Sequence, residues 1–337
     1  MLFEVQCTAG KHRLLDHPNN LMTKCTVIRF ILESGLRLNF DLLTSLFVLT
    51  RIFSNPLSNV FQKKLTGNSA DPLFIIFVTH GILTLASLPV LFFVLPLNLS
   101  VYFWGNIFIC ALLAIAGNTL IVAALKSTDL SVLGPINAYK SIVSIILGIF
   151  MLGEFPTLMG VVGILLILFG SYFIMDRVPD QPQKNVFSQF FANKGILLRF
   201  AALILSATEA IFLKKALLLS SPLITFIFWC ILGMPIACIA TVSMLRGRVL
   251  DEIVTLKQEE INFLLLAATT GLMQLSTLYT FGVLQVGYSL ALFQTSTLLS
   301  VFFGYQFFQE KNIARRLLGS VVMVLGAIFI IVFGSRG

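Results

Sequence analysis

Charged residues are scarce in this chain of 337 residues, because Asp, Glu, Lys and Arg together make up only 11% of it. A soluble domain carries about 25% charged residues, which cover its surface. Hydrophobic residues reach 57% and the mean hydropathy is +0.95. The low charge excludes a cytosolic enzyme and predicts a polytopic helical membrane protein.

Residue types that build metal, redox and catalytic sites are also few. The chain has five cysteines with no close pair, and three histidines. We therefore expect no disulfide framework, no metal site and no cofactor. No Asp falls within the apolar segments described below, and the motifs HExxH, GxSxG and GxGxxG do not occur. These absences predict that the protein is not an enzyme. The net charge of +8 is scattered over loop ends, which argues against nucleic-acid binding.

What the chain does contain is ten apolar segments, each close to the length of about 20 residues that a bilayer span needs. A more polar tail, residues 1–40, precedes them; it has no cleavable signal pattern and is either disordered or contains an interfacial helix over 27–40. We expect an all-α integral membrane protein with ten transmembrane helices. The segments are 42–62, 73–95, 101–124, 130–151, 156–175, 196–218, 223–245, 261–284, 287–308 and 317–334.

The ten segments form two similar copies of five, residues 41–175 and 195–334, joined by a hydrophilic linker over 176–194. Phe61-Gln62-Lys63-Lys64 recurs as Phe212-Leu213-Lys214-Lys215 after 151 residues. Because each copy has an odd number of helices, the second enters the membrane from the opposite side, which predicts an inverted repeat. A constant shift of 156 residues pairs Asn118 with Gln274, Ser141 with Thr297, Ser144 with Ser300, Gly148 with Gly304, Glu154 with Glu310, Gly163 with Gly319, and Gly170 with Gly326.

Two of these stretches resemble a known family. Leu152-Gly153-Glu154-Phe155-Pro156, followed by Gly163 and Gly170, is similar to the pattern of the EamA family of the drug/metabolite transporter superfamily. Phe308-Gln309-Glu310, followed by Gly319 and Gly326, resembles it more loosely, because the basic residue and the proline after Glu310 are displaced. The resemblance covers about residues 42–334. It implies ten helices, a central cavity and transport of small metabolites, but not a particular substrate.

Ionisable side chains within the segments are candidates for function, because a charge at the bilayer centre costs roughly 2.5–3.5 kcal/mol on insertion scales. Arg51, Lys140 and Glu209 lie mid-way along their segments. The repeat partners of Lys140 and Glu209 are serines, so the duplicated scaffold does not require these two charges. Arg199 lies near the start of its segment, and we expect it to snorkel to the interface.

Polar residues on the first segment form one stripe, since they recur at spacings of three to four. Pro56 falls within the stripe and removes one backbone hydrogen bond, which is tolerated where a helix lines a water-filled cavity. The alternative is a kinked helix packed against its neighbours, with Arg51 neutralised by Glu209. The stripe consists of Arg51, Asn55, Ser58 or Asn59, and Gln62.

Carboxamides on other segments bind either another helix or a ligand, because an amide in hydrocarbon needs partners. The small residues Ser144, Gly148, Ser300 and Gly304 are expected to allow close helix packing, and Glu154 and Glu310 to anchor loops or repeat interfaces. His80 is expected to be buried and satisfied. The residues that we expect to bind substrate are Lys140, Glu209, Arg51, Asn55, Asn137, Asn118, Gln274 and Gln294.

Together these features predict a secondary active transporter that moves a small polar or amphiphilic metabolite by alternating access. Arg51, Lys140 and Glu209 give the cavity a formal charge of +1, so the expected substrate is anionic or zwitterionic, for example amino acid-like. A proton or a counter-substrate is the candidate coupling partner. The alternatives are a nucleotide-sugar or organic-phosphate exchanger of the same superfamily, or a non-transporting scaffold or sensor. We expect a monomer or homodimer in the lipid bilayer of a plasma membrane or bacterial inner membrane.

Overall fold

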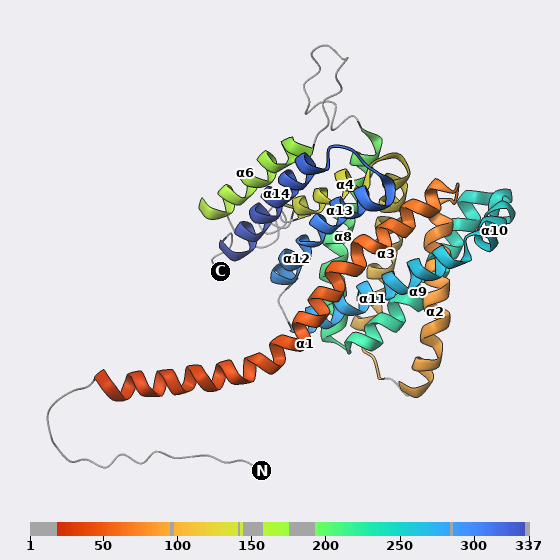
Figure 1. The fold of residues 1–337 in the computed structure, drawn as a ribbon. Helices are drawn as coiled ribbons and strands as arrows, with labels where there is room; N and C mark the ends of the chain where they lie inside the picture. Colours follow the sequence, from red (N-terminus) through yellow and green to blue (C-terminus); the bar gives the residue numbers. More distant parts are fainter. Residues whose placement is uncertain are drawn as a thin grey trace. The chain divides into compact units, whose positions relative to one another are not determined.

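The structure is a computed structural model that describes residues 19–94, 98–140, 142–143, 158–174, 193–283 and 286–333. These residues are helical or lie in turns and short connections, and none of them belongs to a strand, so the predicted all-α class is confirmed. The chain divides into two units, Met1–Ser45 and Leu46–Gly337. The elements and the cavity described below belong to the second unit, apart from the first part of α1 (Figure 1).

The described elements follow the predicted segments along the chain. In the first half they are α1 (Asn19–Gly67), α2 (Pro72–Val94), α3 (Val101–Ser127), α4 (Leu130–Leu133), the 3-10 helix η1 (Pro135–Ala138) and α6 (Leu158–Ile174). In the second half they are α8 (Lys194–Leu218), α9 (Pro222–Leu245), the 3-10 helix η2 (Arg246–Arg248), α10 (Val249–Gln258), α11 (Glu260–Val283), α12 (Val286–Gln294), α13 (Ser296–Phe308) and α14 (Ile313–Phe333).

Polar caps set the starts of several helices. The side chains of Ser100, Asn193 and Ser221 accept hydrogen bonds from backbone N–H groups in the first turns of α3, α8 and α9. Such caps matter because the first N–H groups of a helix have no partner within it. The positions of the caps explain why the apolar segments begin where they do.

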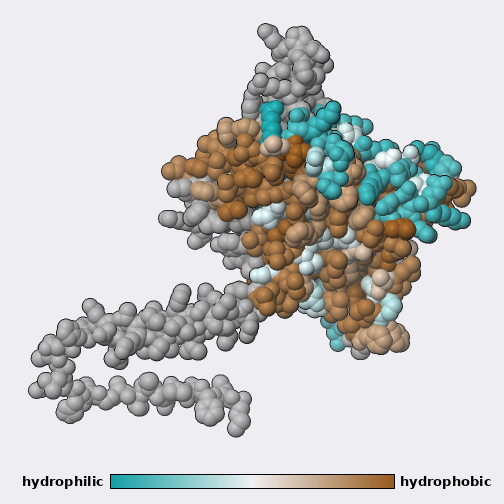
Figure 2. Space-filling model, viewed as in Figure 1, coloured by the Kyte–Doolittle hydropathy of each residue, from teal (hydrophilic) through white to brown (hydrophobic). Residues whose placement is uncertain are grey.

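Five helices within the described ranges are long and apolar enough to cross a membrane: α2, α3, α8, α11, and α9 together with its continuation to Gln258. Their outer faces expose large apolar side chains, such as Leu112 on α3 and Leu272 on α11. Figure 2 shows broad hydrophobic surfaces, with hydrophilic residues gathered over α10 and beside it. The protein is therefore an integral membrane protein, whereas ten crossings remain a prediction.

Two predicted segments, 130–151 and 287–308, are not the continuous helices that we expected. The first begins with α4 and continues as η1, and its residues 141 and 144–151 lie outside the described ones. Pro135 contributes to this interruption because it has no N–H to donate. The second segment divides at Thr295 into α12 and α13. The end of η1 at Ala138 and the end of α12 at Gln294 are 156 residues apart, which is the shift that relates the two predicted copies.

Among the described elements, α6 packs extensively against α14, α3 along α8 and α2 along α9. A Cβ atom placed on Gly170 would lie 2.7 Å from the carbonyl oxygen of Gly319. A Cβ atom placed on Gly326 would lie 2.7 Å from the carbonyl oxygen of Gly163. Only glycine leaves room for backbones this close, so these four residues bring the two helices together.

Candidate functional site

A buried cavity of about 130 Å³ lies among α1, α2, α3, α8, α9, α11 and the two interrupted segments. Polar and charged side chains make up much of its lining, which is unusual at membrane depth and makes this cavity the candidate functional site. The structure brings all eight predicted site residues to this cavity: Arg51, Asn55, Asn118, Asn137, Lys140, Glu209, Gln274 and Gln294. That they bind a substrate remains a prediction.

The polar stripe of α1 faces the cavity along its whole length. Its members Arg51, Asn55, Ser58, Asn59 and Gln62 all belong to the lining, so the cavity-lining interpretation holds rather than simple packing against neighbours. Pro56 lies within the stripe, and the Ser58 hydroxyl donates to the Asn55 carbonyl at 2.9 Å.

Arg51 is held in place by neutral groups. Its Nε donates to the Thr277 hydroxyl at 2.8 Å, and the guanidinium carbon lies 5.0 Å from the centre of the Phe293 ring. The buried Nη1 has no hydrogen-bond partner among the described residues. A guanidinium oriented in this way can still offer hydrogen bonds to a carboxylate or phosphate.

Arg199 contradicts our expectation that it would snorkel to the interface. Its side chain is buried and lines the cavity, where it donates to the Leu133 carbonyl at 3.3 Å and to the Asn137 carboxamide oxygen. Snorkelling requires a lipid-facing side of the helix, but Arg199 lies on the inner face of α8 together with Ser206 and Glu209. The spacings of seven and three residues between these positions were the signal in the sequence that could have revealed the shared face.

Further polar side chains of the cavity lining lie at the interruptions of the two broken segments. Asn137 and Lys140 lie at the end of η1, and Gln294 and Ser296 flank the break between α12 and α13. The Asn55 amide donates to the Ser296 hydroxyl at 3.4 Å, which links α1 to this break. Irregular backbone at membrane depth is tolerated where it is buried in protein or lines a cavity, and in transporters it often forms the binding site.

Glu209 is the acidic residue of the lining, within a site dominated by cations. It interacts electrostatically with Lys140 and Arg51, and its Oε1 lies 3.9 Å from the Cys110 sulfur. With Arg199 included, the lining carries three cations and one anion. The formal charge is therefore +2 rather than the +1 that we predicted. This excess favours a ligand that brings negative charge.

Several carboxamides of the lining keep polar atoms without protein partners. Gln62 Oε1, Gln274 Nε2 and Gln294 Oε1 are buried and have no hydrogen-bond partner among the described residues. Such atoms are costly unless water or a solute satisfies them. Gln274 and its repeat partner Asn118 both line the cavity, as the paired positions predicted.

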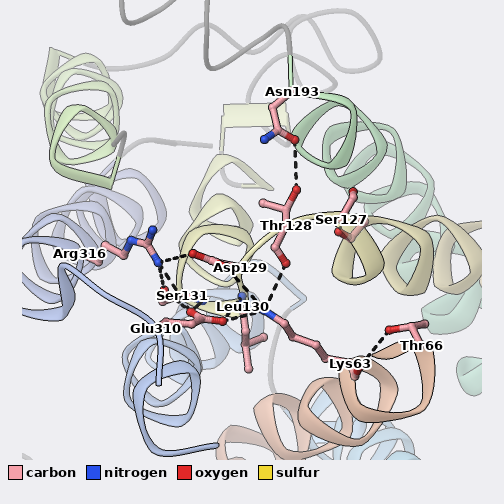
Figure 3. Close-up of polar contacts among 11 residues, drawn as sticks. Lys63, Thr66, Ser127, Thr128, Asp129, Leu130, Ser131, Asn193, Glu310 and Arg316 are labelled. Atoms are coloured by element: carbon pink, nitrogen blue, oxygen red, sulfur yellow. Dashed lines mark hydrogen bonds and ion pairs between the residues drawn. The ribbon is translucent and has the colours of Figure 1, made fainter. Parts of the chain in front are cut away.

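Next to the cavity, four charged residues join the ends of several helices: Lys63, Asp129, Glu310 and Arg316, which we call the Glu310 cluster (Figure 3). Glu310 Oε1 accepts from Lys63 Nζ at 2.7 Å and from the Leu130 N–H at 2.8 Å. Arg316 Nη1 lies 2.9 Å from Asp129 Oδ2. Glu310 therefore anchors the start of α4, in the role that we expected for it.

The carboxylate of Glu310 is strongly stabilised in its ionised form. Burial by itself raises its pKa, but hydrogen bonds from Lys63 and Ser131, together with the Lys63 charge, outweigh burial and lower it. Gly304 leaves the space that this carboxylate occupies, because a Cβ atom there would overlap Glu310 Oε2. Gly304 and Ser300 are buried in helix contacts, as predicted. Their partners Gly148 and Ser144, and Glu154, lie outside the described residues.

His80 is buried, as expected, but only one of its two ring nitrogens has a hydrogen-bond partner among the described residues. Its Nδ1 lies 3.1 Å from the Ile76 carbonyl, whereas Nε2 has no partner among the described residues. The ring packs 4.6 Å from Trp229, between Trp229 and Gly233. Within the described part of the chain, no group of three or more His, Cys, Asp or Glu residues could hold a metal ion.

The comparison with models of known protein families agrees with the resemblance seen in the sequence. Residues 42–176 match the model of the EamA-like transporter family. A solved structure titled "Crystal structure of protein" is similar over 85% of this chain and 95% of its own, with 15% identity and a TM-score of 0.46. The comparison with curated proteins found no match.

Proposed function

From the premise that residues 42–176 belong to the EamA-like transporter family, we propose that this membrane protein carries a small polar or amphiphilic metabolite by alternating access. The observation that carries the proposal is the buried cavity, where four ionisable groups gather among unpartnered carboxamide atoms. A scaffold without a ligand gains nothing from such costly groups at membrane depth.

Alternating access requires two arrangements of similar energy, which an inverted repeat supplies. The glycine contact of α6 and α14 supports such a repeat. A shift of 156 converts the Gly170–Gly319 contact into the Gly326–Gly163 contact. An interface between two copies related by a two-fold axis has this reciprocal form. We therefore propose that ten helices form two inverted copies, with the axis passing between α6 and α14.

A second pair of contacts has the same relation. α3 packs along α8. The repeat predicts that α11 and α1 make the corresponding contact. In agreement, Phe47 of α1 stacks on Tyr279 of α11 with ring centres 4.5 Å apart, and Arg51 bonds Thr277. The cavity lies among these four helices, where a rocking motion of the copies would expose it to either side.

The charge of the cavity indicates the class of substrate. A surplus of two positive charges favours an anionic solute, or a zwitterion whose amine meets Glu209 while its acidic group meets Lys140 or Arg51. Amino acid-like metabolites fit this description. Exchange of organic phosphates is the second candidate, because the additional cation Arg199 increases the positive surplus that a phosphate group would neutralise.

A counterflow experiment tests the proposal. Purified protein in proteoliposomes, preloaded with each unlabelled candidate, is screened for uptake of labelled amino acids, nucleosides and sugar phosphates. We expect accumulation of one acidic or zwitterionic class and none in protein-free liposomes. If no class accumulates in liposomes that contain folded protein, the scaffold alternative replaces the carrier.

A further inference from the structure

We propose that Arg199 is a second anion site of the cavity, which receives the acidic group of the solute on the side of the Glu310 cluster after Arg51 has held it. This inference rests on the proposed transport function. It assigns a binding role to a residue whose sequence position had indicated only an interfacial anchor.

Arg199 lies at the edge of the cavity that faces the start of α4. It lines the cavity and also packs with Leu130, Leu133 and Gly134 around a narrow space that is too small to hold a water molecule. The N–H of Leu130 donates to Glu310, so only this packed layer separates Arg199 from the Glu310 cluster.

The partners of Arg199 leave its charge unbalanced. Its hydrogen bonds go to the Leu133 carbonyl and the Asn137 carboxamide, and no ion pair of Arg199 occurs among the described residues. Burying a cation that has only neutral partners costs free energy, and an anion that paired with it would offset this cost. The planar guanidinium, with five N–H donors, suits a carboxylate or a phosphate.

Arg51 also donates its hydrogen bond to a neutral group, Thr277, although it differs from Arg199 in interacting electrostatically with Glu209. Under the 151-residue shift, Arg199 corresponds to Val48, which lies one helical turn before Arg51. The two arginines therefore occupy nearly equivalent places on α1 and α8.

The depths of the two arginines differ. The end of α1 at Gly67 and the start of α8 at Lys194 lie on the same side of the protein. Thr128 connects them, because its hydroxyl donates a hydrogen bond to the Asn193 side chain and its carbonyl accepts one from Lys63. At 1.5 Å per residue, the Cα atom of Arg199 lies about 8 Å along its helix from that side and that of Arg51 about 24 Å. A single acidic group thus meets the two arginines in turn. Lys140 interacts electrostatically with both of them.

The test measures anion binding directly, with inorganic phosphate and succinate as probes for the two acid types. The Tm of the purified full chain is recorded against probe concentration, because a ligand of the folded state raises Tm by mass action. We expect a rise for the unchanged protein. Arg199→Gln and Arg51→Gln should each need about tenfold more probe for the same rise, as expected when a charge-assisted hydrogen bond is lost, and the double variant should show no rise.

A merely structural role for Arg199, holding Leu133 and Asn137 in place, has a different signature. It would lower the Tm without probe in both Arg199→Gln and Arg199→Lys, and leave the probe dependence unchanged. The anion site instead predicts that Arg199→Lys, which keeps the charge, retains most of the probe response.

A response of Arg199→Gln equal to that of the unchanged protein, or no response of the unchanged protein to either probe, overturns the site. The counterflow screen separates this failure from that of the proposed function. Anion binding without flux contradicts transport only, and flux that Arg199→Gln leaves intact contradicts the site only.

Discussion

The Glu310 cluster and the cavity lie next to each other, yet their buried charges have different partners. In the cluster, Glu310 is paired with Lys63 and Arg316, and its oxygens also hold the first turn of α4. In the cavity, Arg51 and Arg199 make hydrogen bonds with neutral groups. Removing one member of a buried ion pair is strongly destabilising, whereas a buried cation whose hydrogen bonds go to neutral groups can still pair with an anionic solute.

Removal of Glu310 should have the largest effect on stability. Glu310→Ala leaves Lys63 and Arg316 with the more exposed Asp129 as their remaining anion, so we expect a loss of about 3–5 kcal/mol in the free energy of unfolding. Thermal unfolding in detergent measures it. Glu260→Gln, at an exposed position in the first turn of α11, is the control and should change stability by less than about 0.5 kcal/mol. If the two variants lose equal amounts of stability, the ion pairs of the Glu310 cluster do not stabilise the fold, and the contrast with the cavity fails.

Filling the space beside Glu310 should have the next largest effect. In Gly304→Ala the new Cβ overlaps Oε2, and displacing the carboxylate should cost about 1–3 kcal/mol. Gly105→Ala is the matched control, because a Cβ there meets nothing within 4 Å and alanine favours a helix. The unfolding temperatures of the two variants should therefore move in opposite directions, and a Gly304→Ala protein as stable as the unchanged one would contradict the close contact.

Loss of a cavity charge should reduce transport without unfolding the protein. Lys140→Ala is expected to lower the initial rate of labelled-solute uptake at least about tenfold, which corresponds to one lost charge-assisted contact. Its unfolding temperature should stay close to that of the unchanged protein. Full uptake by Lys140→Ala would rule out the proposed anion contact of this residue.

Acid should weaken the cluster in a defined pH range. The folded-state pKa of Glu310 lies below the ordinary value of 4.5, so its ionisation stabilises the protein above that value. This stability, about 1 kcal/mol for each unit of pKa difference, is lost as the pH falls through the folded-state pKa. The unfolding temperatures of the unchanged protein and Glu310→Gln should differ by a constant amount from pH 7 to pH 5 and converge below about pH 4.5. A constant difference down to pH 3 would show that the carboxylate is not the titrating group.

Much of the architecture could be predicted from local patterns. Apolar segments predicted the helices because a bilayer sets both their length and their composition. The stripe on α1 predicted a cavity-facing surface because helical periodicity places residues three and four apart on one side. Asn118 and Gln274 were recognised through the repeat, and both line the cavity.

Other features depend on contacts between distant segments and could not be read locally. Arg199 seemed close enough to a helix end to reach the interface, but α8 turns it toward Leu133 and Asn137, which lie more than sixty residues earlier. The breaks in segments four and nine were missed because their apolar residues run on through the interruption. Hydropathy indicates that a segment is buried in the membrane or in the protein. It does not show whether the helix is continuous, because a broken helix can be buried to the same extent.

By itself, the sequence determined that the protein is helical, lies in a membrane and carries ionisable groups within its apolar segments. These properties follow from composition and spacing, which act along a single helix. Only the tertiary structure decided which charges neutralise one another. Glu310 meets Lys63 across 247 positions of the chain, while Arg51 and Arg199 direct their hydrogen bonds to neutral groups. Coulomb energy depends on distance in space, and packing alone sets that distance.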